Sequence, residues 1–355
     1  MKMLRESRRK WLPQISLAAA AMVLLAMGPA HAAKPKPGSC PLIITACGCT
    51  ITTAGTFVVA NDLSAAQTTQ PNCIEIAASN SILNVTGFKI LGNDNGKGIG
   101  ILIQRGAENV IVEGTSLGDP SAKPPVPPSP QAKVNLWNIG IEDDGNNAII
   151  AMFQDIGGSL LMDNPNAEPK GNGMAGIFLN GVTNSFIGTF NANFNGKFGV
   201  LVTNSTGVTM ATFTTERNKD TGVKLDSSND ASIGPGAAQN NGKFGMWLAG
   251  SSRNTIHDSN GNFSNGDTGI RLSCAAGKAC PGAGGSNDNR ITNAGAPNNT
   301  LNGIVIEKGN GGNVVTVTHN QGNGGPNDMT DLNPDCDGNT WYNNVGRGNQ
   351  ACNNP

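Results

Sequence analysis

The sequence predicts an all-β protein built as a parallel solenoid, in which coils of about 23 residues stack on one another. Three observations lead to this fold class: a repeated Gly-apolar-x-apolar motif, asparagines at a constant distance before its glycine, and a composition that disfavours helices. Of 355 residues, 48 are glycine and 14% are charged, whereas a typical globular chain has about 25% charged residues. Scarce Glu, Lys and Leu argue against a helical protein. The balance of 24 basic and 25 acidic residues argues against nucleic acid as the main partner.

Residues 1–32 have the features of a secretory signal peptide. Five basic residues precede an apolar run of about 13 residues from Ile15 to Met27, and Ala30-His31-Ala32 fits a cleavage site. The run is shorter than the roughly 20 residues of a spanning helix, although an uncleaved anchor is the alternative. Cleavage would remove five basic residues and one acidic residue, leaving a net charge of about −5. We therefore expect an exported protein, extracellular or periplasmic, with no membrane span after cleavage.

All eight cysteines lie beyond this segment, and an even number in an exported chain predicts disulfides. Eight cysteines allow 105 pairings, so the sequence leaves the connectivity open and only suggests plausible bridges. The expected bridges are Cys274–Cys280, Cys336–Cys352, Cys49–Cys73 and Cys40–Cys47. A metal site around the closely spaced N-terminal cysteines is the alternative, but no CxxC pair or nearby histidine supports zinc. We therefore expect neither a metal nor another cofactor.

The repeated motif defines the coils. Its glycines are spaced by 23, 23, 23, 24 and 34 residues. They are Gly176, Gly199, Gly222, Gly245, Gly269 and Gly303, with earlier copies at Gly100 and Gly140. Each motif predicts a short strand whose alternate residues point inward, and three such strands suit a coil of this length. One coil cannot bury its own apolar row, so neighbouring coils must stack.

Asparagine recurs four residues before most of these glycines. The positions are Asn172, Asn195, Asn218, Asn241, Asn265 and Asn299. In stacked coils with strands about 4.8 Å apart, one phase of the repeat becomes one column in space. The amides are then expected to hydrogen-bond along the stack as an asparagine ladder. The alternative is that these asparagines only form turns, where they tolerate a positive φ.

The phased strands and asparagine turns resemble the right-handed parallel β-helices of the pectate-lyase-like superfamily. The opening segment, with Cys49-Thr-Ile-Thr and Cys73-Ile-Glu-Ile, and the closing Cys336-Asp-Gly-Asn-Thr-Trp-Tyr resemble those of exported bacterial members. The resemblance covers roughly residues 47–352 and implies a right-handed parallel β-helix with inserted loops and disulfides. It implies little about activity, because one fold carries many functions.

The expected organisation has four parts and three insertions. Residues 1–32 form the signal peptide, 33–48 a linker, 49–335 the β-helix, and 336–355 a disulfide-closed cap. Insertions at about residues 118–134, 157–171 and 274–284 interrupt the period. They are expected either to wall one face of the β-helix or to be tolerated surface loops.

The residues between the inward positions of the Gly-led strands form two outward columns. The first column reads Leu102, Glu142, Phe178, Leu201, Lys224, Trp247, Arg271, Val305, and the second reads Gln104, Asp144, Asn180, Thr203, Asp226, Ala249, Ser273, Glu307. Rings that stack on sugars beside polar groups that hold hydroxyls or carboxylates favour a glycan-binding face, and the resemblance implies the same face. The candidate binding residues are Phe178, Lys224, Trp247 and Arg271. Alternatively, these side chains pack under the inserted loops.

Two catalytic arrangements are compatible with these columns. Glu142 and Asp144 are i, i+2 on one strand, about 6.5 Å apart at the backbone, which an inverting glycosidase tolerates. Lys224 with Asp226 and Arg271 offers a base for β-elimination, for which Ca²⁺ is a common cofactor. The polygalacturonase pattern is not reproduced, since Gly-His-Gly is absent. We therefore expect a glycan-binding or structural protein of the cell envelope, with a polysaccharide lyase or glycoside hydrolase as the alternative.

Overall fold

The computed structural model describes residues 38–348 apart from 94–96, 115–131, 158–169, 277, 279, 281–283 and 335–337. The expected signal peptide, the Cys336–Cys352 bridge and most of the first two insertions lie outside the described residues. Within the described part, no helix is long and apolar enough to cross a membrane.

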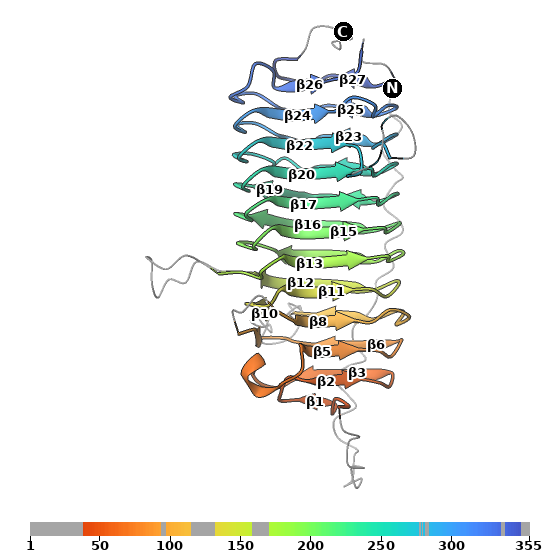
Figure 1. Cartoon of the computed structure of the whole chain (residues 1–355), viewed down its shortest axis with the longest axis vertical. Helices are drawn as coiled ribbons and strands as arrows, with labels where there is room; N and C mark the ends of the chain where they lie inside the picture. Colours follow the sequence, from red (N-terminus) through yellow and green to blue (C-terminus); the bar gives the residue numbers. More distant parts are fainter. Residues whose placement is uncertain are drawn as a thin grey trace, which may run out of the picture. The chain divides into compact units, whose positions relative to one another are not determined.

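The Gly-led strands stack into one 11-stranded parallel sheet, called here the Gly-led sheet. Figure 1 shows them one above another from β2 to β26. In spatial and sequence order they are β2 (Cys49–Ile51), β5 (Asn72–Ile76), β8 (Ile99–Ile103), β11 (Ile139–Asp143), β13 (Ala175–Asn180), β15 (Phe198–Thr203), β17 (Thr221–Asp226), β20 (Phe244–Ala249), β22 (Thr268–Ser273), β24 (Asn302–Ile306) and β26 (Met329–Asp331).

The other strands form a 16-stranded sheet, called the second sheet, which holds the second and third strands of the coils. The second-strand row is β1 (Ile43–Ile44), β3 (Gly55–Val59), β6 (Ser81–Asn84), β9 (Ile111–Glu113), β12 (Ile149–Ile156), β14 (Phe186–Asn191), β16 (Thr209–Glu216), β18 (Ser232–Ile233), β21 (Thr255–His257), β23 (Arg290–Thr292), β25 (Val314–Thr316) and β27 (Thr340–Tyr342). The third-strand row adds β4 (Leu63–Ser64), β7 (Lys89–Leu91), β10 (Ala132–Asn135) and β19 (Gly236–Gln239), and a short 3₁₀ turn, η1, spans Ala65–Gln67.

Strands β12, β14 and β16 belong to both rows. Each bends at a residue with positive φ, namely Met152 (64°), Thr189 (53°) and Thr212 (53°). The part of β16 before the bend pairs with β18, and the part after it pairs with β19. The expected right-handed parallel β-helix with three strands per coil is therefore confirmed, with the second and third strands continuous in these coils.

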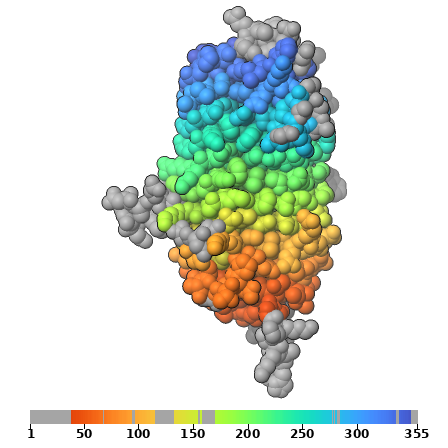
Figure 2. All heavy atoms as spheres, in the orientation of Figure 1, coloured from red at the N-terminus to blue at the C-terminus, as the bar shows by residue number. Residues whose placement is uncertain are grey.

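Register between coils places equal phases of the repeat next to one another. Val200 pairs with Val223 and Val223 with Met246, and all three side chains are fully buried. Burying one such side chain contributes about 1.5–3 kcal/mol relative to leaving it exposed. The space-filling view shows the coils following one another in successive bands (Figure 2). An interior column of apolar side chains thus holds each coil to the next.

The asparagines that stand four residues before the repeat glycines form a buried ladder beside this core. The Nδ2 of Asn195 donates to the Oδ1 of Asn218 at 3.0 Å, and that of Asn218 donates to Asn241 at 3.0 Å. The same Oδ1 atoms accept the backbone N–H of the preceding asparagine, so each amide joins two coils. The ladder comprises Asn172, Asn195, Asn218, Asn241, Asn265 and Asn299.

A second asparagine ladder lies at another corner of the coils. The sequence analysis did not predict it. Each member stands two residues before an inward apolar residue of the second sheet, as Asn254 stands before Ile256. Their Nδ2 to Oδ1 distances are 3.0, 3.1 and 3.0 Å. The members are Asn254, Asn289, Asn313 and Asn339. Insertions vary their sequence spacing, which hides the repeat from a search for a constant period.

The disulfides at the N-terminal end differ from the expected pairs. The structure joins Cys40 to Cys49 and Cys47 to Cys73, so the predicted Cys49–Cys73 and Cys40–Cys47 bridges are wrong. The backbone N–H of Cys40 donates to Thr50, which aligns residues 38–40 with β2 and sets Cys40 beside Cys49. Gly48 donates to the carbonyl of Cys73 and carries Cys47 to it. Cys274 and Cys280 are bridged, as their spacing predicts.

The β-helix extends past both expected boundaries. β1 pairs with β3 although residues 33–48 were expected to be a linker, and β27 pairs with β25 although residues 336–355 were expected to be a cap. Strands that pair with the β-helix therefore occur in both expected terminal segments. The short strands at each end lack the Gly-led motif, so the repeat does not reveal them.

Candidate functional site

The outward columns lie on the Gly-led sheet as the alternation predicts. In β13, Ile177 and Leu179 are fully buried, whereas Phe178 and Asn180 are partly exposed. Register then lines up Glu142, Phe178 and Leu201 on successive coils. Two clusters of possible functional residues occupy this face, one around Trp247 and one around Glu142.

The side chains of the cluster around Trp247 contact one another. The Lys224 Nζ lies 4.2 Å from the centroid of the Trp247 ring, and the Arg271 guanidinium carbon lies 5.5 Å from it. Register places Lys224 and Arg271 on the coils before and after Trp247. The two cations therefore occupy both faces of the indole, in cation–π contacts.

The polar groups of this cluster also have partners within it. Lys224 forms an ion pair with Asp226 at 2.9 Å, and Arg271 donates to Glu307. The indole N–H of Trp247 donates to the Ser273 hydroxyl at 2.7 Å. The Lys224 side chain is only 12% exposed. Two cations therefore lie over the ring that was expected to stack on a sugar, and the role of Trp247 in glycan binding stays a prediction.

Glu142 and Asp144 differ from that cluster because no described residue forms an ion pair or a side-chain hydrogen bond with their carboxylates. Glu142 lies in register between Leu102 and Phe178, two apolar neighbours on adjacent coils. Burial, reinforced by the nearby charge of Asp144, raises the pKa of Glu142 to about 7. The Oδ1 atom of Asp144 is buried and has no hydrogen-bond partner among the residues that the structure describes. A half-buried acid that can exchange its proton near neutral pH, beside a carboxylate, is the arrangement that acid–base chemistry requires.

Asp143, between these two acids, points into the core. It occupies the interior column that holds Ile103 on the previous coil and Leu179 on the next, and it is fully buried. The backbone N–H of Gly145 donates to its Oδ1 at 2.9 Å, and the Ser185 hydroxyl donates to its Oδ2 at 2.8 Å. Burial raises the pKa of Asp143, and the hydrogen bonds from Ser185 and Gly145 oppose that shift. Its phase three residues after Gly140 is the signal that would have identified it as interior.

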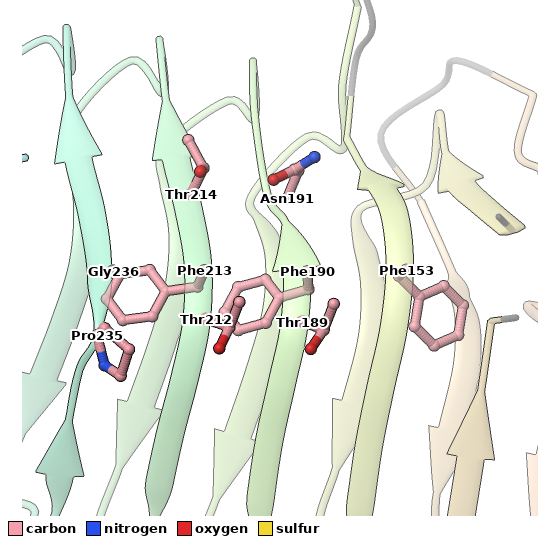
Figure 3. Close-up of a pocket in the computed structure, with 9 residues that line it drawn as sticks. All are labelled: Phe153, Thr189, Phe190, Asn191, Thr212, Phe213, Thr214, Pro235 and Gly236. Carbon is pink, nitrogen blue, oxygen red and sulfur yellow. The ribbon is translucent and has the colours of Figure 1, made fainter. Parts of the chain in front are cut away.

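A shallow hollow of about 380 Å³ lies along the bends of the second sheet (Figure 3). Phe153, Phe190 and Phe213 project side by side from successive coils, with the hydroxyls of Thr189 and Thr212 nearby. The Phe190 and Phe213 rings stack on each other at 5.7 Å with an angle of 15° between their planes. All three phenylalanines are buried. The stacked Phe190 and Phe213 rings therefore pack neighbouring coils against each other.

The residues expected to serve a β-elimination have charged partners in the structure. Lys224 and Asp226 are bound to each other, and Arg271 is bound to Glu307. Among the described residues, no group of three or more His, Cys, Asp or Glu side chains converges as a metal site would.

Comparison with solved structures finds the same fold in proteins of low sequence identity. The A-module of a mannuronan C-5 epimerase from Azotobacter vinelandii matches with a TM-score of 0.52 and 12% identity, over 85% of this chain and 84% of the module. The Dettilon tailspike protein matches with a TM-score of 0.50 and 16% identity over 85% of this chain, which spans about half (54%) of the tailspike. At these identities the likeness establishes a parallel β-helix and no more. No protein-family model and no curated protein matches the chain.

Proposed function

We propose that this protein is an exported glycan-binding β-helix whose ligand lies on the Gly-led sheet over Glu142, Asp144 and Phe178. The observation that carries the proposal is that two clusters on the same sheet face differ in whether their polar groups have partners. The groups around Trp247 satisfy one another, whereas Glu142 and Asp144 have neither a cation nor a hydrogen bond from the described residues to stabilise their charged forms. Unsatisfied acceptors beside a partly exposed ring suit a sugar, which offers hydroxyl donors and an apolar face.

Two further observations support the proposal. The A-module that shares this fold belongs to an enzyme named for mannuronan, a polysaccharide. Three disulfides join described residues, and disulfides persist in oxidising compartments such as the periplasm or the cell exterior. Together they favour a polysaccharide ligand outside the cytoplasm.

The test is binding to a panel of immobilised polysaccharides, with three variants compared. Phe178→Ala and Glu142→Gln should each weaken binding at least tenfold, because they remove the proposed ring contact and one acceptor. Trp247→Ala is the matched control, an aromatic on the same column whose ring faces are already covered, and it should change affinity less than about threefold. Loss of binding in the Trp247 variant alone would refute the placement.

A catalytic role is the second candidate, and the pKa of Glu142 near 7 is the observation that favours it. At neutral pH a fraction of Glu142 is protonated and can act as general acid, while Asp144 on the same side of the strand can activate a water. The expected readout is release of reducing ends from a bound polysaccharide, abolished in Glu142→Gln and in Asp144→Asn. Binding without any product release would leave the glycan-binding role and exclude the hydrolase.

A further inference from the structure

The electrostatics of the Glu142 site restrict the class of glycan that it accepts, provided that the proposed function holds. In β8, β11, β13 and β15 the only charged residues are Glu142 and Asp143, and Asp144 follows directly. No lysine or arginine lies on these four strands, which form the floor beneath any ligand centred on Glu142.

Within the described part of the chain, no ion pair joins a lysine or arginine to Glu142 or Asp144. Along the first outward column the nearest cation is Lys224, three coils from Glu142, or about 14 Å at the spacing of stacked strands. Its charge is already paired with Asp226, and mobile ions screen exposed charges beyond about 8 Å. In the other direction, two coils away, the same column holds another carboxylate, Glu75. Arg105 lies in the exposed turn after β8, and no ion pair joins it to Glu142 or Asp144 within the described chain.

We infer that the glycan held at Glu142 and Asp144 carries no carboxylates: it is a polymer of neutral or amino sugars and not a polyuronate. Sugar hydroxyls and amino groups donate hydrogen bonds to the accessible oxygens of these two partly exposed carboxylates. A uronate would instead place a third negative charge beside them without a cation to bind it. Like charges in such a site disfavour a partner strongly.

The inference is tested with polysaccharides of three charge classes. Immobilised neutral glucans and mannans, chitosan, and polygalacturonate and alginate are presented at pH 8, where Glu142 is ionised, in low and in moderate salt. At least one neutral or amino polymer should bind, and both polyuronates should bind at least tenfold more weakly at low salt. Equal or tighter binding of a polyuronate would overturn the inference while leaving the proposed glycan-binding function intact. Absence of binding in all three classes would refute the proposed function, and the inference with it.

A charge-neutralising variant separates this electrostatic selection from simple fit. The double variant Glu142→Gln with Asp144→Asn should improve polyuronate binding relative to neutral-glycan binding at least tenfold, and should lessen the salt dependence of the difference. Glu113→Gln is the control, because it removes a carboxylate from β9 in the second sheet and should leave the ratio unchanged. An unchanged ratio in the double variant, with the fold intact by circular dichroism, would also overturn the inference.

Discussion

Replacement of Asn218 by alanine tests how much the asparagine ladder contributes to stability. The Asn218 side chain is 1% exposed. Its Oδ1 accepts the backbone N–H of Asn195 at 2.9 Å and the Nδ2 of Asn195 at 3.0 Å. Its Nδ2 donates to the Ala192 carbonyl at 3.0 Å and to the Oδ1 of Asn241 at 3.0 Å. The substitution therefore removes four hydrogen bonds from one buried position.

The expected loss follows from what these partners retain. Nδ2 of Asn195 keeps its bond to Ile156, and Oδ1 of Asn241 keeps the backbone N–H of residue 218. The backbone N–H of Asn195 loses its bond to the Oδ1 of residue 218, and the carbonyl of Ala192 loses its bond from the Nδ2 of that residue. Each buried polar group left unsatisfied costs about 1–3 kcal/mol, so with two such groups Asn218→Ala should lower the free energy of unfolding by about 2–6 kcal/mol.

The assay is urea unfolding followed by circular dichroism, with Asn191→Ala as the control. Asn191 is a partly exposed asparagine of β14 that lies outside the ladder, and its replacement should cost less than about 0.5 kcal/mol, as for most surface substitutions. A loss below about 0.5 kcal/mol in Asn218→Ala would refute the reasoning, because it would show that water replaces the amide at no cost.

Three further predictions address the core, the buried acid and the disulfides. Val223→Asp should cost several kcal/mol and unfold adjacent coils together, because it places an unpaired charge in the interior column; thermal unfolding should show this, and an unchanged Tm would contradict it. Burial raises the pKa of Asp143, so the folded protein loses stability as pH rises towards neutral. Asp143→Asn should therefore raise the Tm at pH 7, and this gain in Tm should shrink towards pH 4. A gain that stays constant with pH would refute the titration argument. Loss of the Cys47–Cys73 bridge, whose cysteines are 26 residues apart, should lower the free energy of unfolding by about 3 kcal/mol. Loss of the Cys274–Cys280 bridge, which closes a shorter loop, should cost less. The Tm values of the two double alanine variants measure both effects.

The sequence by itself determined the architecture, because a motif at constant spacing specifies both the strands of each coil and their stacking. Gly-apolar-x-apolar every 23 residues is meaningful only if coils stack, and stacking converts one phase into one column. That is why the alignment of Val200 with Val223 and the Asn195–Asn218 contact could be inferred without coordinates.

Only the tertiary structure decided which outward residues are satisfied and which are not. Sequence phase places Trp247 and Glu142 on the same column, but it does not tell whether a ring face or a carboxylate already has a partner. That depends on side chains of neighbouring coils, such as Lys224 and Arg271 around the indole. Disulfide pairing at the N-terminal end likewise depends on backbone alignment across coils. Periodicity records which residues are neighbours, whereas the geometry of each contact is set by packing among residues far apart in the chain.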